Sequence, residues 1–281
     1  MIRSFRRHLL DRFVLRPSRN ELVYAPKERV LVTVDRMTDE YFVEYRRARG
    51  DGTCGELSPD HQPIDLLILK FPGTAGRAER ASDWPCRQLP ESTVKICTWN
   101  APGYGASSGR ATLANIARRA SRFWSLVTSG LPAQRPRIWL IGNSLGCATA
   151  TYLASRPEVQ IEGLILRNPP PLIQTVKRVA RQYPLGHLTD AIAESVPPEM
   201  NLSLTAPGAQ VPTVMLQSER DQLVPPALQM EVFDALPGPK RLVILEGLDH
   251  DGITTDQHER EIDQAVHWLW RRSLAFRDRP A

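Results

Sequence analysis

A serine between two glycines, placed directly after an apolar run, restricts the fold of this chain more than any other feature of its sequence. Residues 138–141 (Ile-Trp-Leu-Ile) lead into residues 142–146 (Gly-Asn-Ser-Leu-Gly), and small residues follow at 147–151. The apolar run is typical of a buried strand, and the small residues favour a helix packed close to it. The pattern therefore predicts a strand, a sharp turn at Ser144 and a helix, with Gly142 and Gly146 omitting Cβ atoms that would clash.

Short apolar runs rich in β-branched residues predict about eight strands. They lie at residues 30–34, 41–45, 66–71, 94–99, 138–141, 161–166, 214–217 and 242–245. Several are apolar at nearly every position, which is typical of strands buried on both faces of a parallel sheet. The first two mix apolar and polar residues and predict an antiparallel hairpin at a sheet edge. Helices are predicted after Ser144 and at 111–129, 226–236 and 257–274. We expect an α/β fold with a mostly parallel open sheet flanked by helices.

The length and apolar content favour one large domain. The chain has 281 residues, of which 42% are apolar, and we expect residues 21–281 to share one core. Residues 168–212 are rich in proline and too long for a plain connection between a strand and a helix. We interpret them as a small cap insertion; the alternative is a surface excursion without a catalytic role. As a cap, this segment would line an apolar pocket with Leu172, Ile173, Val176 and Leu188.

Residues 1–20 form a basic amphipathic segment. Its arginines fall mainly on other faces than its apolar residues, which recur at helical spacing at Ile2, Phe5, Leu9 and Phe13. We favour a helix that packs this apolar stripe on the domain; the alternative is a weak peripheral contact with an anionic membrane surface. The sequence has no apolar run of membrane-spanning length and no pattern of a secretory signal peptide. We therefore expect a cytoplasmic protein, with or without this membrane contact.

The charged residues and the cysteines argue against several classes of partner. The net charge is +5, but 36 basic and 31 acidic side chains are mixed along the chain without a nucleic-acid-reading motif, so we expect no nucleic-acid partner. No metal-ligand cluster and no dinucleotide fingerprint is present, so we expect neither a metal nor a cofactor. The dispersed cysteines are expected to be reduced thiols: Cys54, Cys86, Cys97 and Cys147.

The turn at Ser144 has the sequence context of a nucleophile elbow, in which strand, G-x-S-x-G and helix follow one another. Such a turn raises the serine side chain above the end of the strand, where the N-terminus of the helix also points. A serine hydroxyl is a poor nucleophile without a base. His250 lies in the loop after the last predicted strand, whereas His258 and His267 fall within the final helix. We therefore predict Ser144 as the nucleophile and His250 as its base.

The acid that orients the histidine is expected after the predicted strand at 214–217, which precedes the last strand of the sheet. Asp221 occupies the turn there, and the resulting order along the chain is serine, aspartate, histidine. Glu219 is the nearest rival. Asp249 and Asp251 flank His250, but neighbours along a loop rarely point at one another. We favour Asp221 as the third member of a catalytic triad.

An oxyanion formed in acyl transfer needs two hydrogen-bond donors. One is expected from the backbone N–H of Leu145, which directly follows the nucleophile. The other is expected from Thr74, in the loop after the strand at 66–71, through its N–H and with a possible second contact from its hydroxyl. Gly73 would allow the backbone to approach closely. The alternative for this loop is an ordinary glycine turn.

On these residues the chain resembles the α/β-hydrolase superfamily from about residue 30 to residue 274. Ser144, Asp221 and His250 match the triad of that family, and residues 71–74 (Phe-Pro-Gly-Thr) look like its oxyanion loop, although Pro72 stands where many members have histidine. Residues 99–109 are similar to the glycine-rich loop of members with a short cap. Within the superfamily the chain resembles small serine esterases and aminopeptidase-like serine hydrolases.

The resemblance and the residues together predict a serine hydrolase with a small-molecule acyl substrate. We expect cleavage of a carboxylic ester, a thioester or a small amide through an acyl-enzyme intermediate. One alternative is a non-catalytic ligand-binding protein on a hydrolase scaffold. Another is a serine peptidase or lipase that acts on peptide or lipid substrates. Because one fold hosts many chemistries, the geometry of the site has to decide between them.

Overall fold

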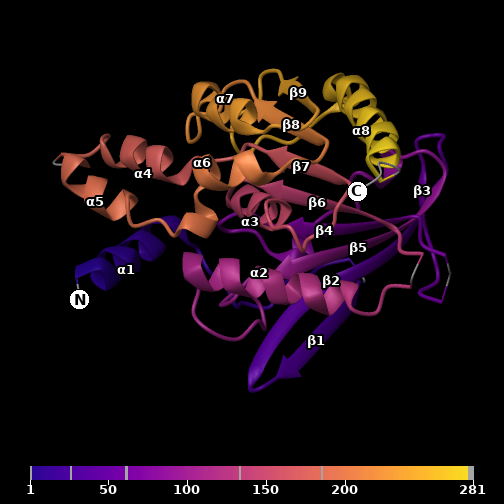
Figure 1. The fold of residues 1–281 in the computed structure, drawn as a ribbon, viewed down its shortest axis with the longest axis horizontal. Helices are drawn as coiled ribbons and strands as arrows, with labels where there is room; N and C mark the ends of the chain where they lie inside the picture. Colours follow the sequence, from indigo (N-terminus) through magenta and orange to yellow (C-terminus); the bar gives the residue numbers. More distant parts are fainter. Residues whose placement is uncertain (1, 26, 61–62, 133, 185, 278–281) are drawn as a thin grey trace.

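The computed structural model describes residues 2–25, 27–60, 63–132, 134–184 and 186–277. Within these ranges the strands form one sheet with the order β1-β2-β5-β4-β6-β7-β8-β9, and β3 pairs with β2 (Figure 1). Their bounds are β1 Glu28–Val34, β2 Met37–Ala48, β3 Cys54–Glu56, β4 Leu66–Phe71, β5 Ser92–Asn100, β6 Arg137–Asn143, β7 Gly163–Arg167, β8 Thr213–Ser218 and β9 Lys240–Leu245.

The sheet is mixed in the way that the sequence predicts. β2 pairs antiparallel with β1, β3 and β5, whereas the remaining neighbours, from β5 across to β9, are parallel. The predicted α/β fold, with its antiparallel hairpin at the edge, is confirmed. β3 is the strand that the sequence did not predict, because its three residues (Cys-Gly-Glu) are too few to show an alternation.

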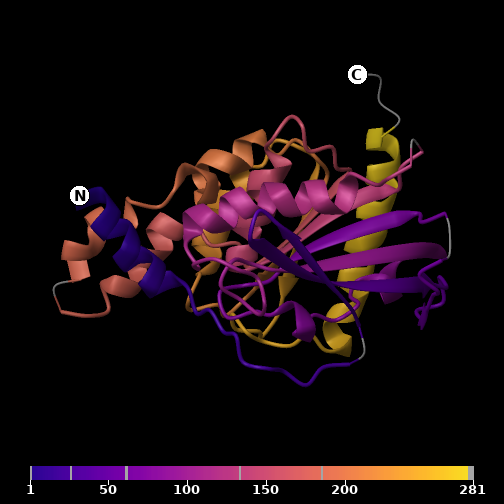
Figure 2. The ribbon, with the colours of Figure 1, turned by 90° about the horizontal axis from the view of Figure 1, so that it is seen from below.

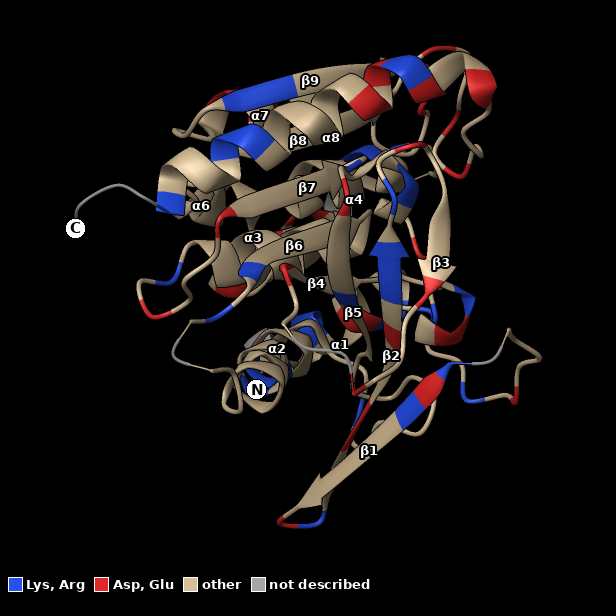
Figure 3. Ribbon diagram, turned by 90° about the vertical axis from the view of Figure 1, so that its right-hand side faces the viewer, with Lys and Arg blue, Asp and Glu red and all other residues tan. Residues whose placement is uncertain are grey.

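Helices cover both faces of the sheet. Their bounds are α1 Ile2–Val14, α2 Leu113–Thr128, α3 Leu145–Ala154, α4 Leu172–Ala180, α5 Asp190–Ala193, α6 Leu202–Thr205, α7 Pro226–Ala235 and α8 Asp256–Arg277. Because successive side chains of a strand point to opposite faces, β4 packs Leu67 and Leu69 with residues of α2 and α3. Its Leu66 and Ile68 pack with residues of α8 on the other face. Acidic and basic residues are interspersed over these elements (Figure 3).

The insertion at 168–212 holds α4, α5 and α6. It lies with α1 at one end of the molecule, away from the hairpin of β1 and β2 (Figure 2). α5 contacts α1, and α6 contacts α3. Leu172 and Val176 are buried in the core on the α2 and α3 face of the sheet. The insertion is therefore anchored on the body by its own apolar residues.

The N-terminal segment is helical and packs on the domain, but through a different residue from those predicted. Leu10 is fully buried, whereas Phe5 is 62% exposed and Phe13 is 41% exposed. Asp11 Oδ1 accepts a hydrogen bond of 2.9 Å from the backbone N–H of Leu113, at the start of α2. The side chain of Ile2 lies outside the described residues. None of the helices that the structure describes is both long and apolar enough to cross a membrane.

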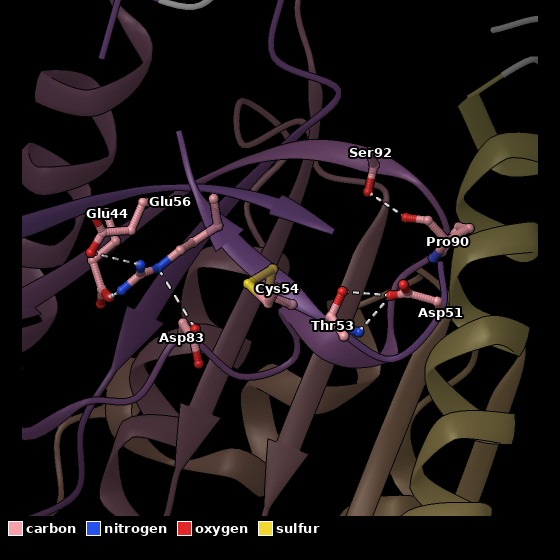
Figure 4. The surroundings of a disulfide bond; sticks show 10 residues. Glu44, Asp51, Thr53, Cys54, Glu56, Asp83, Pro90 and Ser92 are labelled. Atoms are coloured by element: carbon pink, nitrogen blue, oxygen red, sulfur yellow. Dashed lines mark hydrogen bonds and ion pairs between the residues drawn. A yellow bond between two sulfur atoms is a disulfide. The ribbon is translucent and has the colours of Figure 1, made fainter. Parts of the chain in front are cut away.

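Two of the four cysteines form a disulfide, so the prediction of four reduced thiols is wrong for this pair. Cys54 in β3 is bonded to Cys86 in the short 3-10 helix Cys86–Gln88. Figure 4 shows the bond between the turn of Asp51 and Thr53 and the carboxylates of Glu44 and Asp83. The two cysteines are 32 residues apart and meet only because β3 pairs with β2. Disulfides are rare in the cytosol, so this bond argues against the predicted cytoplasmic location.

Cys97 and Cys147 are free and buried, as packing residues should be. Burial raises the pKa of the Cys97 thiol to about 12, which keeps it protonated at neutral pH. These two cysteines therefore agree with the sequence prediction.

Loss of the disulfide should destabilise the protein. A cross-link that closes a loop of 32 residues restricts the unfolded chain, and such loops contribute about 3 to 4 kcal/mol to the free energy of unfolding. We expect Cys54→Ser to lower the Tm by several degrees in a thermal melt. Reductant should lower the Tm of the natural protein and leave that of the variant unchanged. Equal melting of the two proteins without reductant would contradict the prediction.

Candidate active site

Ser144 sits on a strained turn between β6 and α3. Its φ of 51° is one that side-chain-bearing residues rarely adopt, and such a conformation costs about 1 to 3 kcal/mol. A Cβ on Gly142 would lie 2.6 Å from the amide nitrogen of Cys147, and a Cβ on Gly146 would collide with the carbonyl oxygen of Phe71. Both glycines are therefore required by close backbone approach, as the sequence predicts.

The three residues predicted as a triad meet in one chain of hydrogen bonds. His250 Nε2 lies 2.8 Å from Ser144 Oγ, and His250 Nδ1 lies 2.7 Å from Asp221 Oδ2. Ser144 follows β6, Asp221 follows β8 and His250 follows β9. Because parallel strands end at one edge of the sheet, these three loops lie together. Asp221 is buried, whereas its rival Glu219 turns away and accepts a hydrogen bond of 2.8 Å from the Gly247 N–H.

Both oxygens of Asp221 are held by partners besides the histidine. Oδ1 accepts a hydrogen bond of 2.8 Å from the Val224 N–H, and Oδ2 accepts one of 3.1 Å from Gln229 Nε2. Gln229 is fully buried in α7, and its amide also donates to the Val224 carbonyl at 2.7 Å. The sequence did not single out Gln229, because a glutamine within a predicted helix is most often a surface residue.

Asn168 is a second residue that the sequence did not single out. It is fully buried directly after β7, with a φ of 51°. Its Nδ2 donates to Ser218 Oγ and to the His250 carbonyl, each at 3.0 Å, and its Oδ1 accepts from the Ser218 N–H at 2.9 Å. Asn168 therefore ties the loop of His250 to the end of β8. The sequence feature that could have pointed to Asn168 is its position between a predicted strand and a run of three prolines.

The loop after β4 packs against the turn of Ser144. A Cβ on Gly73 would lie 3.3 Å from Ser144 Cβ, so glycine allows this approach. The Thr74 N–H has no hydrogen-bond partner among the residues that the structure describes. Its hydroxyl donates to the Val14 carbonyl, and its carbonyl accepts a bond of 2.6 Å from the Tyr104 hydroxyl. The predicted contact of the Thr74 hydroxyl with an oxyanion is therefore wrong, and the N–H of Thr74 stays a predicted donor beside that of Leu145.

A cleft of about 710 Å³ opens at Ser144 and His250. Its walls come from the loops after β4 and β9, and its apolar lining includes Phe71, Trp84, Ile141, Ile165, Leu216 and Ile253. None of the lining residues belongs to the described part of the insertion, so the prediction that Leu172, Ile173 and Val176 line the pocket is wrong. Leu172 and Val176 are buried in the core and Ile173 packs against it, whereas the side chain of Leu188 lies outside the described residues. The cleft is of the size that small-molecule sites have.

Arg167 joins the cleft to the loop of His250. It ends β7, and its carbonyl accepts a hydrogen bond of 2.8 Å from the Ser144 N–H. Its guanidinium donates to the carbonyl of Gly252. Burial lowers the pKa of Arg167, and the nearby Asp251 carboxylate opposes this shift.

Among the described residues no group of three or more His, Cys, Asp or Glu side chains is placed to hold a metal ion.

Solved structures of esterases and of a peptidase share this architecture. The esterase Pf2001 of Pyrococcus furiosus has a TM-score of 0.60 and 15% identity, over 93% of this chain and 98% of that chain. Est1E of Butyrivibrio proteoclasticus, with ferulic acid bound, has a TM-score of 0.62 and 15% identity, over 88% and 99%. An acylaminoacyl peptidase has a TM-score of 0.62 and 12% identity, over 90% of this chain and 42% of its own.

The chain has the α/β-hydrolase fold. The resemblance inferred from the sequence is thus confirmed for the fold. At such low identity the likeness to these α/β-hydrolase structures concerns the fold alone.

Two uncharacterized proteins of Mycobacterium tuberculosis, from strains CDC 1551 and H37Rv, are related in sequence. Each is 31% identical over 162 residues, which are 56% of this chain and 53% of the relative. The match spans about half the length of these curated relatives. No protein-family model matches the chain.

Proposed function

We propose that this protein is a serine hydrolase that cleaves a carboxylic ester through an acyl-enzyme intermediate. The observation that carries the proposal is the unbroken series of hydrogen bonds from Asp221 through His250 to Ser144, which lines the cleft. A nucleophile, a base in contact with it and a buried acid in contact with the base are the parts that acyl transfer requires. The strained elbow and the two glycines that it needs support the same role for Ser144.

Each step of the reaction uses a group that lies in this site. Ser144 Oγ attacks the ester carbonyl while His250 Nε2 takes its proton, and Asp221 holds the imidazole tautomer and stabilises its positive charge. The N–H groups of Leu145 and Thr74 donate to the oxyanion that forms. The bond to the alcohol then breaks, and His250 gives its proton to the leaving oxygen. Water, activated by His250, attacks the acyl group, releases the carboxylic acid and restores Ser144.

An activity screen separates this proposal from its alternatives. We expect p-nitrophenyl esters to be hydrolysed faster than aminoacyl anilides, and a fluorophosphonate probe to label the natural protein. The reverse order of rates would favour a peptidase. A folded protein that neither turns over any ester, thioester or anilide nor takes the label would favour a non-catalytic binding protein.

For the N-terminal helix we retain the proposal of a weak contact with an anionic membrane surface. Phe5 and Phe13 are exposed on α1 next to the exposed cations Arg6 and Arg12, a combination that suits a lipid surface. Because Leu10 and Asp11 attach the helix to the body, substitution of the two phenylalanines leaves its packing intact.

We expect the protein to sediment with anionic vesicles at low salt and to be released as salt rises. The double variant Phe5→Ser, Phe13→Ser should stay in the supernatant. Leu31→Ser, which removes an exposed apolar side chain from β1, is the matched control and should sediment like the natural protein. Absence of sedimentation at low salt would contradict the membrane contact and leave α1 with a packing role.

A further inference from the structure

The charged side chains that line the cleft are mostly cationic. They are Lys70, Arg77, Arg80 and Arg167, against one carboxylate, Asp251. Arg77 is neutralised by the buried Glu79. The other three cations form no ion pair with any residue that the structure describes. A cleft with an apolar lining and several unpaired cations is suited to a ligand that carries negative charge.

Lys70 is the most deeply buried of the three cations that form no ion pair. It lies on β4, on the face of the sheet that also carries Leu66 and Ile68, and only 8% of it is exposed. Its Nζ donates a hydrogen bond of 2.7 Å to the Ser82 carbonyl, which leaves two of its three protons without a partner in the described structure.

The carboxylates nearest to Lys70 are occupied elsewhere. Glu44 binds Lys27 at 3.0 Å and Arg46 at 2.7 Å, and Asp83 lies 3.7 Å from Arg46. A buried cation without a counter-ion is unfavourable. Lys70 is therefore placed to gain a partner that enters through the cleft.

Lys70 is also within reach of a molecule that is bonded to Ser144. It pairs with Ile141 across β4 and β6, three residues before the serine, so the two backbones are separated by roughly 10 Å along the strands. Ile141, the partner of Lys70 on β6, lines the cleft together with its own neighbour Ile165 on β7. A short aliphatic chain that starts at the reacting carbonyl would lie along Ile141 and end at the ammonium group.

We propose that the ester cleaved here carries a carboxylate or phosphate at the far end of its acyl chain, and that Lys70 binds this anion. The inference rests on the proposed function of the Ser144 site. We assign the anion to the acyl part because that part stays attached to Ser144 until water releases it, whereas the alcohol has to leave through the mouth of the cleft. Arg80 and Arg167, which also line the cleft, add to its positive potential.

The test compares charged and neutral substrates of equal length. The p-nitrophenyl monoesters of glutaric and adipic acids and of 4-phosphonobutyric acid are measured beside p-nitrophenyl valerate and hexanoate, as kcat/KM. We expect the natural protein to prefer the anionic esters by about tenfold or more. The carboxylate and phosphonate arms decide which anion fits better. Hydrolysis of the neutral esters without any preference would overturn the inference while leaving the proposed hydrolase function intact.

Lys70→Met should abolish this preference, chiefly through a higher KM for the anionic esters. Lys95→Met is the matched control, because Lys95 lies on the neighbouring strand β5, stacks on the Tyr45 ring and does not line the cleft. The control should keep the preference of the natural protein. An equal loss in both variants, or none in Lys70→Met, would overturn the assignment.

The pH dependence of the preference tests the natural protein and needs no variant. Burial lowers the pKa of Lys70 to about 8, with Glu44 and Asp83 opposing the shift and Lys27 adding to it. The ammonium is charged below this pKa, so the preference for anions should decline as the pH rises through about 8. An effect of pH that both esters share cancels in the ratio of their rates. A ratio that stays constant from pH 7 to pH 9.5 would contradict a role for Lys70.

Binding separates failure of this inference from failure of the proposed hydrolase function. Glutarate monoamide is titrated into Ser144→Ala protein while the fluorescence of Trp84, which lines the cleft, is followed against Trp84→Phe protein. Saturable binding that Lys70→Met removes supports the anion site even if no ester is hydrolysed. Absence of binding to the Ser144→Ala protein, together with absence of an anion preference in turnover, would overturn it.

Discussion

Substitution of Ser144 by alanine is expected to lower kcat on the best ester by about three to six orders of magnitude. The variant loses the oxygen that lies 2.8 Å from His250 Nε2, and no other hydroxyl in the described structure contacts that nitrogen. The fold should survive, because alanine keeps the Cβ and leaves Gly142 and Gly146 in place. Steady-state rates and the loss of fluorophosphonate labelling measure the missing nucleophile, and a thermal melt measures the retained fold.

Ser155→Ala is a suitable control for this experiment. Ser155 caps the other end of α3, where its hydroxyl donates to the Tyr152 carbonyl at 2.7 Å, far from the cleft. Its variant should keep near-natural turnover and full labelling. A Ser144→Ala protein that still turns over ester at more than a few per cent of the natural rate would show that Ser144 is not the nucleophile.

Substitution of Asp221 by asparagine should have the second-largest effect, a loss of about 10⁴ in kcat. The buried Asp221 carboxylate accepts a hydrogen bond from His250 Nδ1–H, whereas an asparagine amide can present an N–H there and favour the wrong tautomer of the imidazole. The asparagine oxygen can still accept from the Val224 N–H, but an amide nitrogen in place of Oδ2 meets the Gln229 Nε2 donor as well as the histidine.

Glu219→Gln tests the same chemistry two residues away. Glu219 is exposed and accepts from the Gly247 N–H, a role that the carbonyl oxygen of glutamine retains. We expect a change of less than about threefold in kcat, within the range of a surface substitution. Comparable losses in the two variants, or a larger loss at Glu219, would remove Asp221 from the triad.

The residues that carry the proposed chemistry could be found in the sequence because they follow strands in a fixed order. A strand buried on both faces is a continuous apolar run, and the loop after it carries the side chain that does the chemistry. Ser144, Asp221 and His250 each follow such a run. Gln229 and Asn168, which position two of them, could not be found in this way, because a buried amide has no pattern of its own until its partners are known.

Predictions that depended on where a segment packs were less successful. The apolar residues of the insertion were expected in the pocket, but Leu172 and Val176 fill the core. The stripe of the N-terminal helix was expected to be buried, but Leu10 is the residue that faces the body and Phe5 is exposed. Apolarity tells which residues avoid water, and it does not tell which of several apolar surfaces receives them.

The local sequence by itself determined the strands, the strained turn of Ser144 and the order of the three triad residues, because these depend on backbone sterics and on the two-residue period of a strand. Tertiary structure alone decided the contacts between distant segments. It joined Cys54 to Cys86, turned the Thr74 hydroxyl toward Val14 and left Lys70 in the cleft without a carboxylate. Such contacts arise only when the sheet has formed, since the crossover from β5 past β4 to β6 and the pairing of β3 with β2 bring together residues that the sequence keeps apart.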